Sequence, residues 1–386
     1  MTDLLLLHAD GSTRTESLAE APAFRRPTRP LTSRVAYAAA HVVPRIAGEN
    51  VPGHPADIDW DATLAFRRHV WSWGLGVADA MDTAQRNMGL DAQATRDLIR
   101  RSAEAAREVG GDLVVGVNTD HVDEEHIPLE RVIDAYVEQL EFTEEQGAGV
   151  VLMASRHLAR AAQSAADYER VYDAVLSRAT GPVVLHWLGE AFDPNLAGYF
   201  GSREVPAATD TVVAIIERHL EKVRGIKMSL LDADAEIAVR SRLPEGATLF
   251  TGDDFNYVGL IAGDGERHSD ALLGAFAAVA PNASAAIAAL DAGDTEAYTR
   301  ILGPTEELSR QIFAAPTWFY KTGVAFLAWL NGHQPAFTMV GGLHSARSLP
   351  HLSEIVRLAN AAGALERPEL AAARWHSMLT VNGVHR

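Results

Sequence analysis

The chain has 386 residues, of which 47% are hydrophobic and 22% are charged, and this composition is ordinary for a soluble globular protein. Its formal net charge of −17 opposes binding to nucleic acid, and no basic stripe interleaved with aromatic residues offsets that charge. Cysteine is absent, which excludes disulfides, thiolate metal sites and cysteine nucleophiles. No segment reaches the roughly 18 uninterrupted apolar residues that would span a bilayer.

The N-terminal segment predicts a small separate element. The apolar run Leu4 to Leu7 is followed by Asp10-Gly11 and by a polar run through Thr13 and Thr15, a pattern that predicts a β-hairpin. We expect this hairpin to cap one end of the main fold, with residues 1–34 forming the hairpin and a proline-rich connector. The apolar run is too short for a signal-peptide core and lacks a basic flank, so we expect a cytoplasmic protein.

The middle of the chain alternates short apolar runs with helical segments. The clearest helix is Leu129 to Gln146, whose apolar residues fall on one face and which Gly147 ends. Eight runs are candidate strands: Val35–Val43, Leu75–Asp79, Leu113–Asn118, Val150–Met153, Val183–Trp187, Arg224–Lys227, Thr248–Thr251 and Gly274–Val279. Strands that alternate with helices pair in parallel, and eight such units close into a (β/α)8 barrel, the TIM barrel, which we predict over residues 35–285. An open doubly wound sheet is the alternative, although no Gly-x-Gly-x-x-Gly follows a strand.

The last hundred residues carry only helical patterns, so we predict a C-terminal helical extension over residues 286–386. The predicted helices are Ser284–Leu290, Thr295–Leu302, Thr305–Phe313, Thr317–Leu330 and Pro350–Ala362. The exposed faces of such an extension suit contacts between copies, so we expect a homo-oligomer, either a dimer or a tetramer.

The sixth predicted strand carries the residue that decides the functional interpretation. The chain has three lysines, and Lys227 lies among the last residues of that strand, where desolvation disfavours the charged amine. A neutral lysine amine attacks carbonyl carbons, and the resulting imine is an electron sink. A lysine that points outward or pairs with a carboxylate explains the stretch almost as well. His186 lies on the preceding strand, beside Lys227, and is suited to proton transfer near neutral pH.

Further polar residues follow the predicted strands, where a barrel holds its catalytic groups. A loop position is usually polar for structural reasons, so only some of these side chains are expected to act on a substrate. The predicted site combines Lys227, His186 and Thr83 as catalytic residues with a substrate-binding set of His41, Asp79, Asp82, Asn118, Ser229 and Asp253.

The order of motifs resembles the dihydrodipicolinate synthase and N-acetylneuraminate lyase family of class I aldolases, over residues 35–365. Gly225-Ile226-Lys227 resembles that family's Schiff-base lysine on strand six, and Thr251-Gly252-Asp253-Asp254 resembles its strand-seven motif. Three further segments resemble the start of the first barrel helix, the eighth strand with its proline turn, and the C-terminal helices: Asp57-Ile58-Asp59, Gly274 to Pro281, and Glu306 to Lys321 with Pro350. The resemblance implies imine chemistry on a small oxo compound, with no cofactor.

Two departures from the family pattern concern the substrate. The family's Gly-Thr-Thr-Gly-Glu loop, which holds the carboxylate of a 2-keto acid, is Asp82-Thr83-Ala84-Gln85-Arg86 here. Its proton-relaying tyrosine on strand five is replaced by His186 in His186-Trp187-Leu188-Gly189. Together the changes weaken the case for pyruvate as the substrate and leave imine chemistry possible, and a keto sugar or sugar acid is the small oxo compound that we expect.

Three functions remain open at this stage. The first is a lyase, aldolase or dehydratase that forms an imine at Lys227. The second is a metal-dependent sugar isomerase or aldolase, whose nitrogen and oxygen ligands would come from His121, His157, His186, Glu190 and Asp253. The third is a barrel that binds a metabolite without converting it. The first needs no metal and no ligand beyond a small oxo substrate. The composition argues against nucleic acid and membranes as partners, so the expected partners are that substrate and further copies of the chain.

Overall fold

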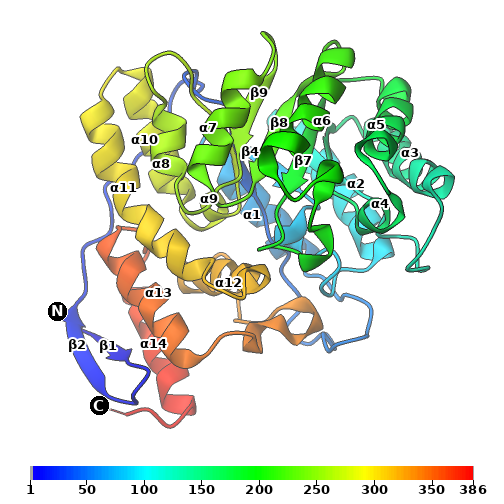
Figure 1. The fold of residues 1–386 in the computed structure, drawn as a ribbon. Coiled ribbons are helices and arrows are strands. Elements are labelled where there is room, and N and C mark those ends of the chain that lie inside the picture. Colours follow the sequence, from blue (N-terminus) through cyan, green and yellow to red (C-terminus); the bar gives the residue numbers. More distant parts are fainter. Residues whose placement is uncertain (1–2, 386) are drawn as a thin grey trace.

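Eight parallel strands close into a barrel in the computed structural model, which describes residues 3–385 (Figure 1). Each strand pairs with the next along the chain, and the last pairs with the first, which rules out the open sheet. The strands are β3 (Ala36–Ala39), β4 (Gly76–Asp79), β5 (Leu113–Val117), β6 (Gly149–Leu152), β7 (Val183–Leu188), β8 (Val223–Ser229), β9 (Thr248–Thr251) and β10 (Asp270–Leu273). The predicted TIM barrel is therefore confirmed.

Helices connect successive strands and cover the outside of the barrel (Figure 1). Aspartate side chains begin several of them; the Asp59 carboxylate, for example, accepts the amide hydrogen of Ala62 and starts the first helix. The helices are α1 (Trp60–Ser72), α2 (Ala92–Val109), α3 (Leu129–Glu145), α4 (Arg156–Ala161), α5 (Ala165–Arg178), α6 (Val205–Arg218), α7 (Ala233–Arg242) and α8 (Tyr257–Ala262). Short 3-10 helices interrupt two loops at the carboxyl ends of the strands: η1 (Asp82–Ala84), η2 (Pro194–Leu196) and η3 (Tyr199–Gly201).

The eighth strand begins earlier than the sequence predicts. The strand is β10, and the predicted run Gly274–Val279 instead contains a short helix, α9 (Ala275–Ala278). The prediction was wrong because an alanine-rich apolar run is buried in either conformation, and periodicity cannot separate the two in so short a segment. The consequence is that Gly274 lies directly at the carboxyl end of β10.

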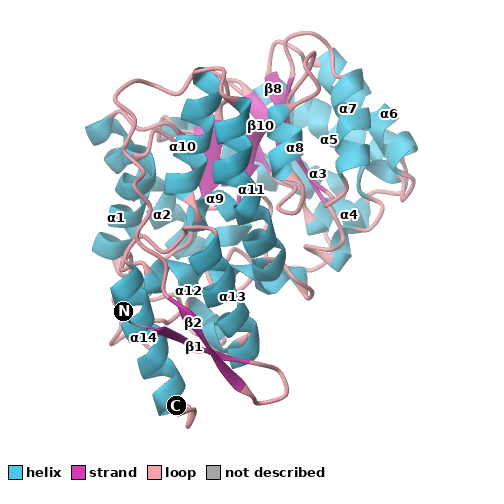
Figure 2. Ribbon diagram, turned by 90° about the vertical axis from the view of Figure 1, so that its left-hand side faces the viewer, coloured by secondary structure: helices cyan, strands magenta, loops and turns pink. Residues whose placement is uncertain are grey.

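The C-terminal helices pack beside the barrel, and the N-terminal hairpin packs on them (Figure 2). They are α10 (Ala280–Asp291), α11 (Thr295–Ile312), α12 (Tyr320–Leu330), α13 (Leu349–Ala361) and α14 (Pro368–Val381), with η4 (Thr317–Phe319) and η5 (Val340–Ser345) between them. Two predicted helices form the single helix α11, which continues through Pro304, and α14 was not predicted. Among residues 3–385, no helix is long and apolar enough to cross a membrane.

The hairpin consists of β1 (Asp3–Leu7) and β2 (Thr13–Ser17), paired antiparallel as predicted. It does not cap the barrel, because its apolar strand lies against α13 and α14. The Trp375 indole donates to the Leu5 carbonyl at 2.7 Å, and the Ser353 hydroxyl accepts from the Leu7 amide at 2.8 Å. The hairpin therefore covers apolar surface of the C-terminal helices.

The first half of the barrel is held by a buried ion pair between Arg67 of α1 and Asp79 of β4. The guanidinium donates to both Asp79 oxygens, at 3.0 and 2.7 Å, and to the His41 carbonyl at 2.6 Å. Both side chains are fully buried. Removing one partner of such a pair leaves an uncompensated charge in the interior.

We expect Asp79→Ala to lower the free energy of unfolding by about 3–5 kcal/mol, measured by urea denaturation, because Arg67 would keep its charge without a carboxylate. Asp97→Ala is the matched control, since Asp97 pairs with Arg100 at the surface and should contribute at most about 1 kcal/mol. Equal losses in the two variants would show that the buried pair does not stabilise the fold.

Candidate active site

Lys227 points into the barrel near its carboxyl end. Residues on neighbouring strands at one register level face the same side, and Lys227 pairs with His186 of β7 and with Phe250 of β9, which belongs to the apolar cluster inside the barrel. The residue is only 8% exposed. Within residues 3–385, its Nζ has neither a hydrogen bond nor an ion pair, although it is not sealed from solvent. The surface-lysine interpretation therefore does not apply.

The charges of two carboxylates influence the pKa of this amine, although neither carboxylate forms a hydrogen bond or an ion pair with it. Burial lowers the pKa of Lys227, while the charges of Asp82 and Asp254 raise it and offset part of that shift. Burial also raises the pKa of Asp254 to about 7. The Oδ1 atom of Asp254 accepts the amide hydrogen of Ala275 at 2.9 Å, so its position is fixed by the start of α9. The pKa shifts of Lys227 and Asp254 are thus in opposite directions, downward for the amine and upward for the carboxyl group, and perturbed groups of this kind suit acid–base chemistry.

His186 and Ser229 lie beside the lysine inside the barrel. The His186 Nε2 atom and the Ser229 hydroxyl are 3.3 Å apart, and His186 is fully buried with its Nδ1 atom unpartnered. Burial, with a further contribution from the Lys227 charge, holds the pKa of His186 well below its ordinary value. The imidazole is therefore neutral at physiological pH.

Gly252, just after β9, makes room for the lysine side chain. A Cβ atom there would lie 2.1 Å from the Ser229 hydroxyl and 2.8 Å from Cε of Lys227. Any larger residue would displace both groups. The glycine of the Gly252-Asp253-Asp254 motif is therefore required by the path of Lys227 across the barrel.

Thr83 contacts a tyrosine from the C-terminal helices. The Thr83 and Tyr320 hydroxyl oxygens are 2.7 Å apart in a buried hydrogen bond, and the Tyr320 ring stacks on Phe313 with centroids 4.3 Å apart. Burial raises the pKa of Tyr320 well above its ordinary value, and the charges of Asp82 and Asp254 add to that shift. Tyr320 therefore remains a protonated phenol close to the two carboxylates that act on Lys227.

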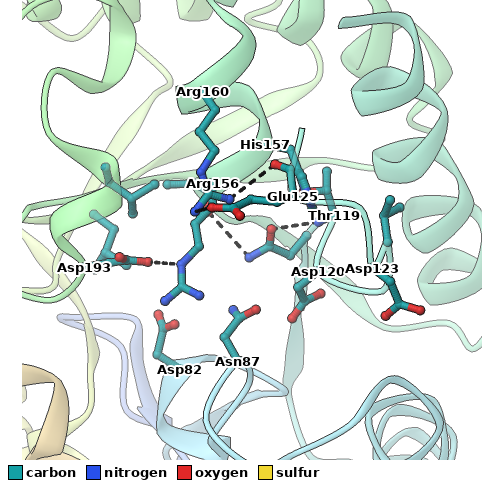
Figure 3. A pocket seen from close by; sticks show the side chains of 15 residues that line it. Asp82, Asn87, Thr119, Asp120, Asp123, Glu125, Arg156, His157, Arg160 and Asp193 are labelled. Atoms are coloured by element: carbon teal, nitrogen blue, oxygen red, sulfur yellow. Dashed lines mark hydrogen bonds and ion pairs between the residues drawn. The ribbon is translucent and has the colours of Figure 1, made fainter. Parts of the chain in front are cut away.

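Two adjoining cavities lie over the mouth of the barrel, with volumes of about 200 and about 180 Å³. They share Asp82, Asn87, Arg156 and Asp193. The first continues along the loops after β5 and β6, and its further polar lining is Asn118, Thr119, Asp120, Asp123, Glu125, His157 and Arg160 (Figure 3). The second is closed by Trp318, Tyr320 and Lys321. We call the two cavities together the vestibule. Asp82 borders both of them and its charge raises the pKa of Lys227, so it connects the vestibule with the lysine.

Of the cations that line the vestibule, Arg156 and Lys321 border the cavity beside Tyr320. Arg156 donates from Nε to Asp193 at 2.5 Å, and its two terminal amino groups have no partner within residues 3–385; Figure 3 shows them pointing towards Asp82 and Asn87. Lys321 donates to the Trp318 carbonyl at 3.0 Å. Burial lowers the pKa of Lys321 to about 8, against the opposing charges of Asp82 and Asp193. The free fork of Arg156 is suited to a carboxylate or phosphate group.

Three of the predicted substrate-binding residues have structural partners instead. Asp79 faces outward because it is one residue beyond the inward-facing Ala78, and it pairs with Arg67. His41 is buried against Phe66 and bonds to Gln334 at 2.9 Å. Asp253 accepts the amide hydrogens of Phe255 and Asn256, at 2.9 and 3.1 Å, and so shapes the turn after β9. By contrast, Asp82 and Asn118 line the vestibule, and Ser229 lies beside His186 and Lys227 inside the barrel.

The ligands predicted for a catalytic metal have separate partners. His121 bonds to Glu138 and Gln139, and His157 bonds to Thr119 and the Glu124 carbonyl. His186 is sealed inside the barrel, and Glu190 is exposed. None of the five residues belongs to the one group of three in the described chain whose donor atoms have metal-ligand spacing.

Four residues that the structure brings to the site were not among the predicted site residues. Asp254 is the residue after the predicted Asp253. Side chains alternate between inward and outward along a strand, and Gly252 faces inward, so this alternation indicates that Asp254, two residues later, faces inward as well. Tyr320 and Lys321 come from a helix start far along the chain, and Arg156 begins α4. No local pattern marks Tyr320 and Lys321, since only tertiary contacts between the barrel and α12 bring them to the mouth, whereas Arg156 reaches it from the loop after β6.

Comparisons with known proteins place the chain in a family and identify its fold relatives. The profile of the family described as "Protein of unknown function (DUF993)" matches residues 4–384. The chain belongs to this family. No curated protein sequence matches it significantly.

Solved structures of dihydrodipicolinate synthases have a similar fold. The enzyme from Bacteroides thetaiotaomicron aligns with a TM-score of 0.64 at 14% identity, covering 84% of this chain and 98% of the other. The Bacillus anthracis enzyme has a TM-score of 0.62 at 16% identity, with coverages of 84% and 98%. The 4-hydroxy-tetrahydrodipicolinate synthase of Methylacidiphilum fumariolicum SolV has 0.63 at 16%, covering 89% and 99%. At these identities the likeness establishes the fold.

We expect Gly252→Ala to lower the free energy of unfolding by about 1–3 kcal/mol and to alter the labelling of Lys227 by an amine-reactive reagent, because the new methyl group overlaps its side chain. Urea denaturation and peptide mass spectrometry measure the two effects. Gly259→Ala in α8 is the control, since a Cβ atom there meets nothing within 4 Å. An unchanged Lys227 labelling rate in Gly252→Ala would contradict the described side-chain path.

Proposed function

We propose that this protein is a class I lyase or aldolase, or a related dehydratase, that forms a Schiff base between Lys227 and a small oxo compound. The observation that carries the proposal is the unpartnered Nζ atom of Lys227 inside the barrel mouth. The fold shared with the dihydrodipicolinate synthases supports it as an analogy, because one fold serves many reactions.

The first step is the attack of the neutral Lys227 amine on the carbonyl carbon of the substrate. Burial lowers the pKa of Lys227 and so increases the fraction of neutral amine. The addition gives a carbinolamine, which loses its hydroxyl group as water and leaves a protonated imine. The imine accepts the electron pair released when an adjacent carbon–carbon bond breaks, or when a proton leaves that carbon.

Proton transfer to and from these intermediates is assigned to Asp254 and to the Thr83–Tyr320 pair. A carboxyl group with a pKa of about 7 accepts and donates protons with similar ease at neutral pH. The Tyr320 phenol stays protonated and can donate to a developing hydroxide through Thr83, 2.7 Å away. His186 is neutral and bonds to Ser229, and this contact holds the side chains beside Lys227 in place. His186 is a second candidate for the proton shuttle.

The lining of the vestibule favours a polyhydroxylated substrate with an acid group. Carboxylates and amides accept hydrogen bonds from hydroxyl groups, and Asp82, Asn87, Asn118 and Asp120 supply such acceptors around one cavity. The free fork of Arg156 offers paired donors for the acid group. A keto sugar acid meets both requirements, and a keto sugar without an acid group meets the first. Assembly into a dimer or tetramer and a cytoplasmic location stay predictions, which light scattering and cell fractionation test.

We expect incubation with a panel of 2-oxo acids and keto sugars, followed by borohydride reduction, to give a covalent adduct on Lys227. Peptide mass spectrometry identifies the modified residue among the three lysines of the chain. Lys227→Arg should abolish the adduct, because its guanidinium stays protonated and is not a nucleophile. Lys222→Arg, in the loop before β8, is the matched control and should retain it.

The outcome also separates the alternatives. A ligand that binds wild type and Lys227→Arg equally, with no adduct and no conversion, would favour a metabolite-binding barrel over an enzyme. Absence of any Lys227 adduct across the whole panel, in protein that remains folded, would contradict the Schiff-base proposal.

We expect the rate of adduct formation to rise with pH as Lys227 loses its proton, and the midpoint to move to lower pH in Asp82→Asn and Asp254→Asn. The sign follows because each carboxylate charge raises the pKa of Lys227, so removing it makes the free amine available at lower pH. Rapid quench with borohydride over a pH series measures the midpoint. Asp210→Asn, which removes a surface partner of Arg242, should leave it unchanged, and an upward shift in the two site variants would contradict the assignment.

A further inference from the structure

Two histidines and a glutamate from three separate segments converge beside α1, outside the vestibule. They are His69 in the last turn of α1, His333 in the loop after α12, and Glu366 between α13 and α14. One nitrogen or oxygen atom from each lies within 4.8 Å of the others. Within residues 3–385, no other group of three histidine or acidic side chains has this spacing.

The two imidazoles point at the same carboxylate oxygen. The Nε2 atom of His333 lies 2.7 Å from Oε1 of Glu366, and Nε2 of His69 lies 3.5 Å from it. Donors around one tetrahedral zinc ion lie about 3.4 Å apart, given metal–ligand distances of about 2.0–2.1 Å. The 3.5 Å distance between His69 and Glu366 matches this value. The 2.7 Å distance between His333 and Glu366 is that of a hydrogen bond, and it would increase slightly if a bound ion replaced the shared proton.

The segments that carry these ligands are already held in place. Asn331, 3% exposed, accepts the Glu366 amide hydrogen at 2.9 Å and donates to the Ala364 carbonyl at 2.9 Å. The His333 amide donates to the Ala328 carbonyl at 2.9 Å at the end of α12. The two loops are therefore fixed relative to each other without help from the three side chains. Binding an ion costs little ordering of the chain when its ligands are held in this way.

The surroundings allow an ion to enter while keeping the ligands partly dry. The His69, His333 and Glu366 side chains are 12%, 18% and 23% exposed, so the cluster can be reached from solvent. Phe66 packs against both imidazoles, with ring centroids 6.0 and 5.6 Å away, and Trp73 packs against His69. A set of two neutral imidazoles and one carboxylate suits Zn²⁺ and similar divalent transition metals better than Mg²⁺ or Ca²⁺.

We propose that His69, His333 and Glu366 bind one divalent transition-metal ion, of which Zn²⁺ best fits the donors. The ion joins the first barrel helix to two adjacent loops of the C-terminal helical layer, the loop after α12 and the loop between α13 and α14. Its role is to stabilise the contact between α1 and that layer, which also supplies Tyr320 from the opposite end of α12. The site lies outside the vestibule and does not depend on the function proposed for Lys227.

The test uses the full-length protein after dialysis against a chelator, titrated with Zn²⁺ alone. We expect one equivalent to bind by calorimetry and by elemental analysis, and Co²⁺ to give the visible absorption of a four-coordinate site. His69→Asn and Glu366→Gln should each weaken Zn²⁺ binding at least about 10-fold, because each removes a ligand. Both variants keep the Asn331 hydrogen bonds, so they test the ligands rather than the loop fold.

Thermal unfolding gives a second readout. Saturating Zn²⁺ should raise Tm of the wild type by about 4 °C and leave Glu366→Gln unchanged. His219→Asn is the matched control, because His219 also bonds a carboxylate, Asp173 at 2.7 Å, but lies elsewhere and should retain Zn²⁺ binding. Absence of stoichiometric Zn²⁺ binding in the wild type would overturn the proposal. So would Zn²⁺ binding in His69→Asn and Glu366→Gln that is as tight as in the wild type, and the three residues would then be a hydrogen-bonded His–Glu cluster.

Discussion

The burial of one lysine amine without a bonded counter-ion is the constraint on which the mouth of this barrel depends. An ammonium group in a dry interior is costly unless it is paired or loses its proton. Lys227 is surrounded by Phe250, the neutral His186 and the backbone at Gly252, so the nearest charges are carboxylates that act on it without bonding. A bonded carboxylate would hold the proton on the amine and suppress its nucleophilicity. The separation therefore keeps the amine available.

The C-terminal helices complete the site from outside the barrel. Apolar side chains such as Tyr37, Val114 and Leu272 pack with Phe250 inside the barrel, and Phe250 borders the layer that holds Lys227. That layer is closed by Tyr320 and Lys321 at the start of α12, and Phe313 stacks on Tyr320 from the end of α11. The position of α12 thus sets both a hydrogen-bond partner of Thr83 and one wall of the vestibule. Contacts between α12 and the barrel therefore affect the site chemistry.

The sequence predicts the barrel well because its signals are local and repeated. Seven of the eight strands lie within the predicted runs or overlap them, and α3 ends at Glu145, just before the Gly147 that its pattern marks as the stop. The exception is Gly274–Val279, where small apolar residues fit a buried helix as well as a strand. The site is less predictable because inward and outward positions alternate along each strand. Ala78 and Asp79 are neighbours in sequence, yet one faces the interior and the other pairs with Arg67.

The replacement of the strand-five tyrosine by His186 has a structural counterpart in Tyr320. In the resembling aldolases a tyrosine on strand five relays protons, and this chain has a buried, neutral imidazole at that position. A phenol nevertheless reaches the same mouth from α12 and bonds to Thr83, the one residue retained from the family's loop after strand two. A proton relay requires a donor at a given point in space and sets no requirement on the segment that carries it. A Cβ atom at Gly274 would lie 3.0 Å from the Phe313 ring and 3.1 Å from the Tyr320 ring, so a side chain there would press on this stacked pair, and the glycine at the end of β10 belongs to the same arrangement.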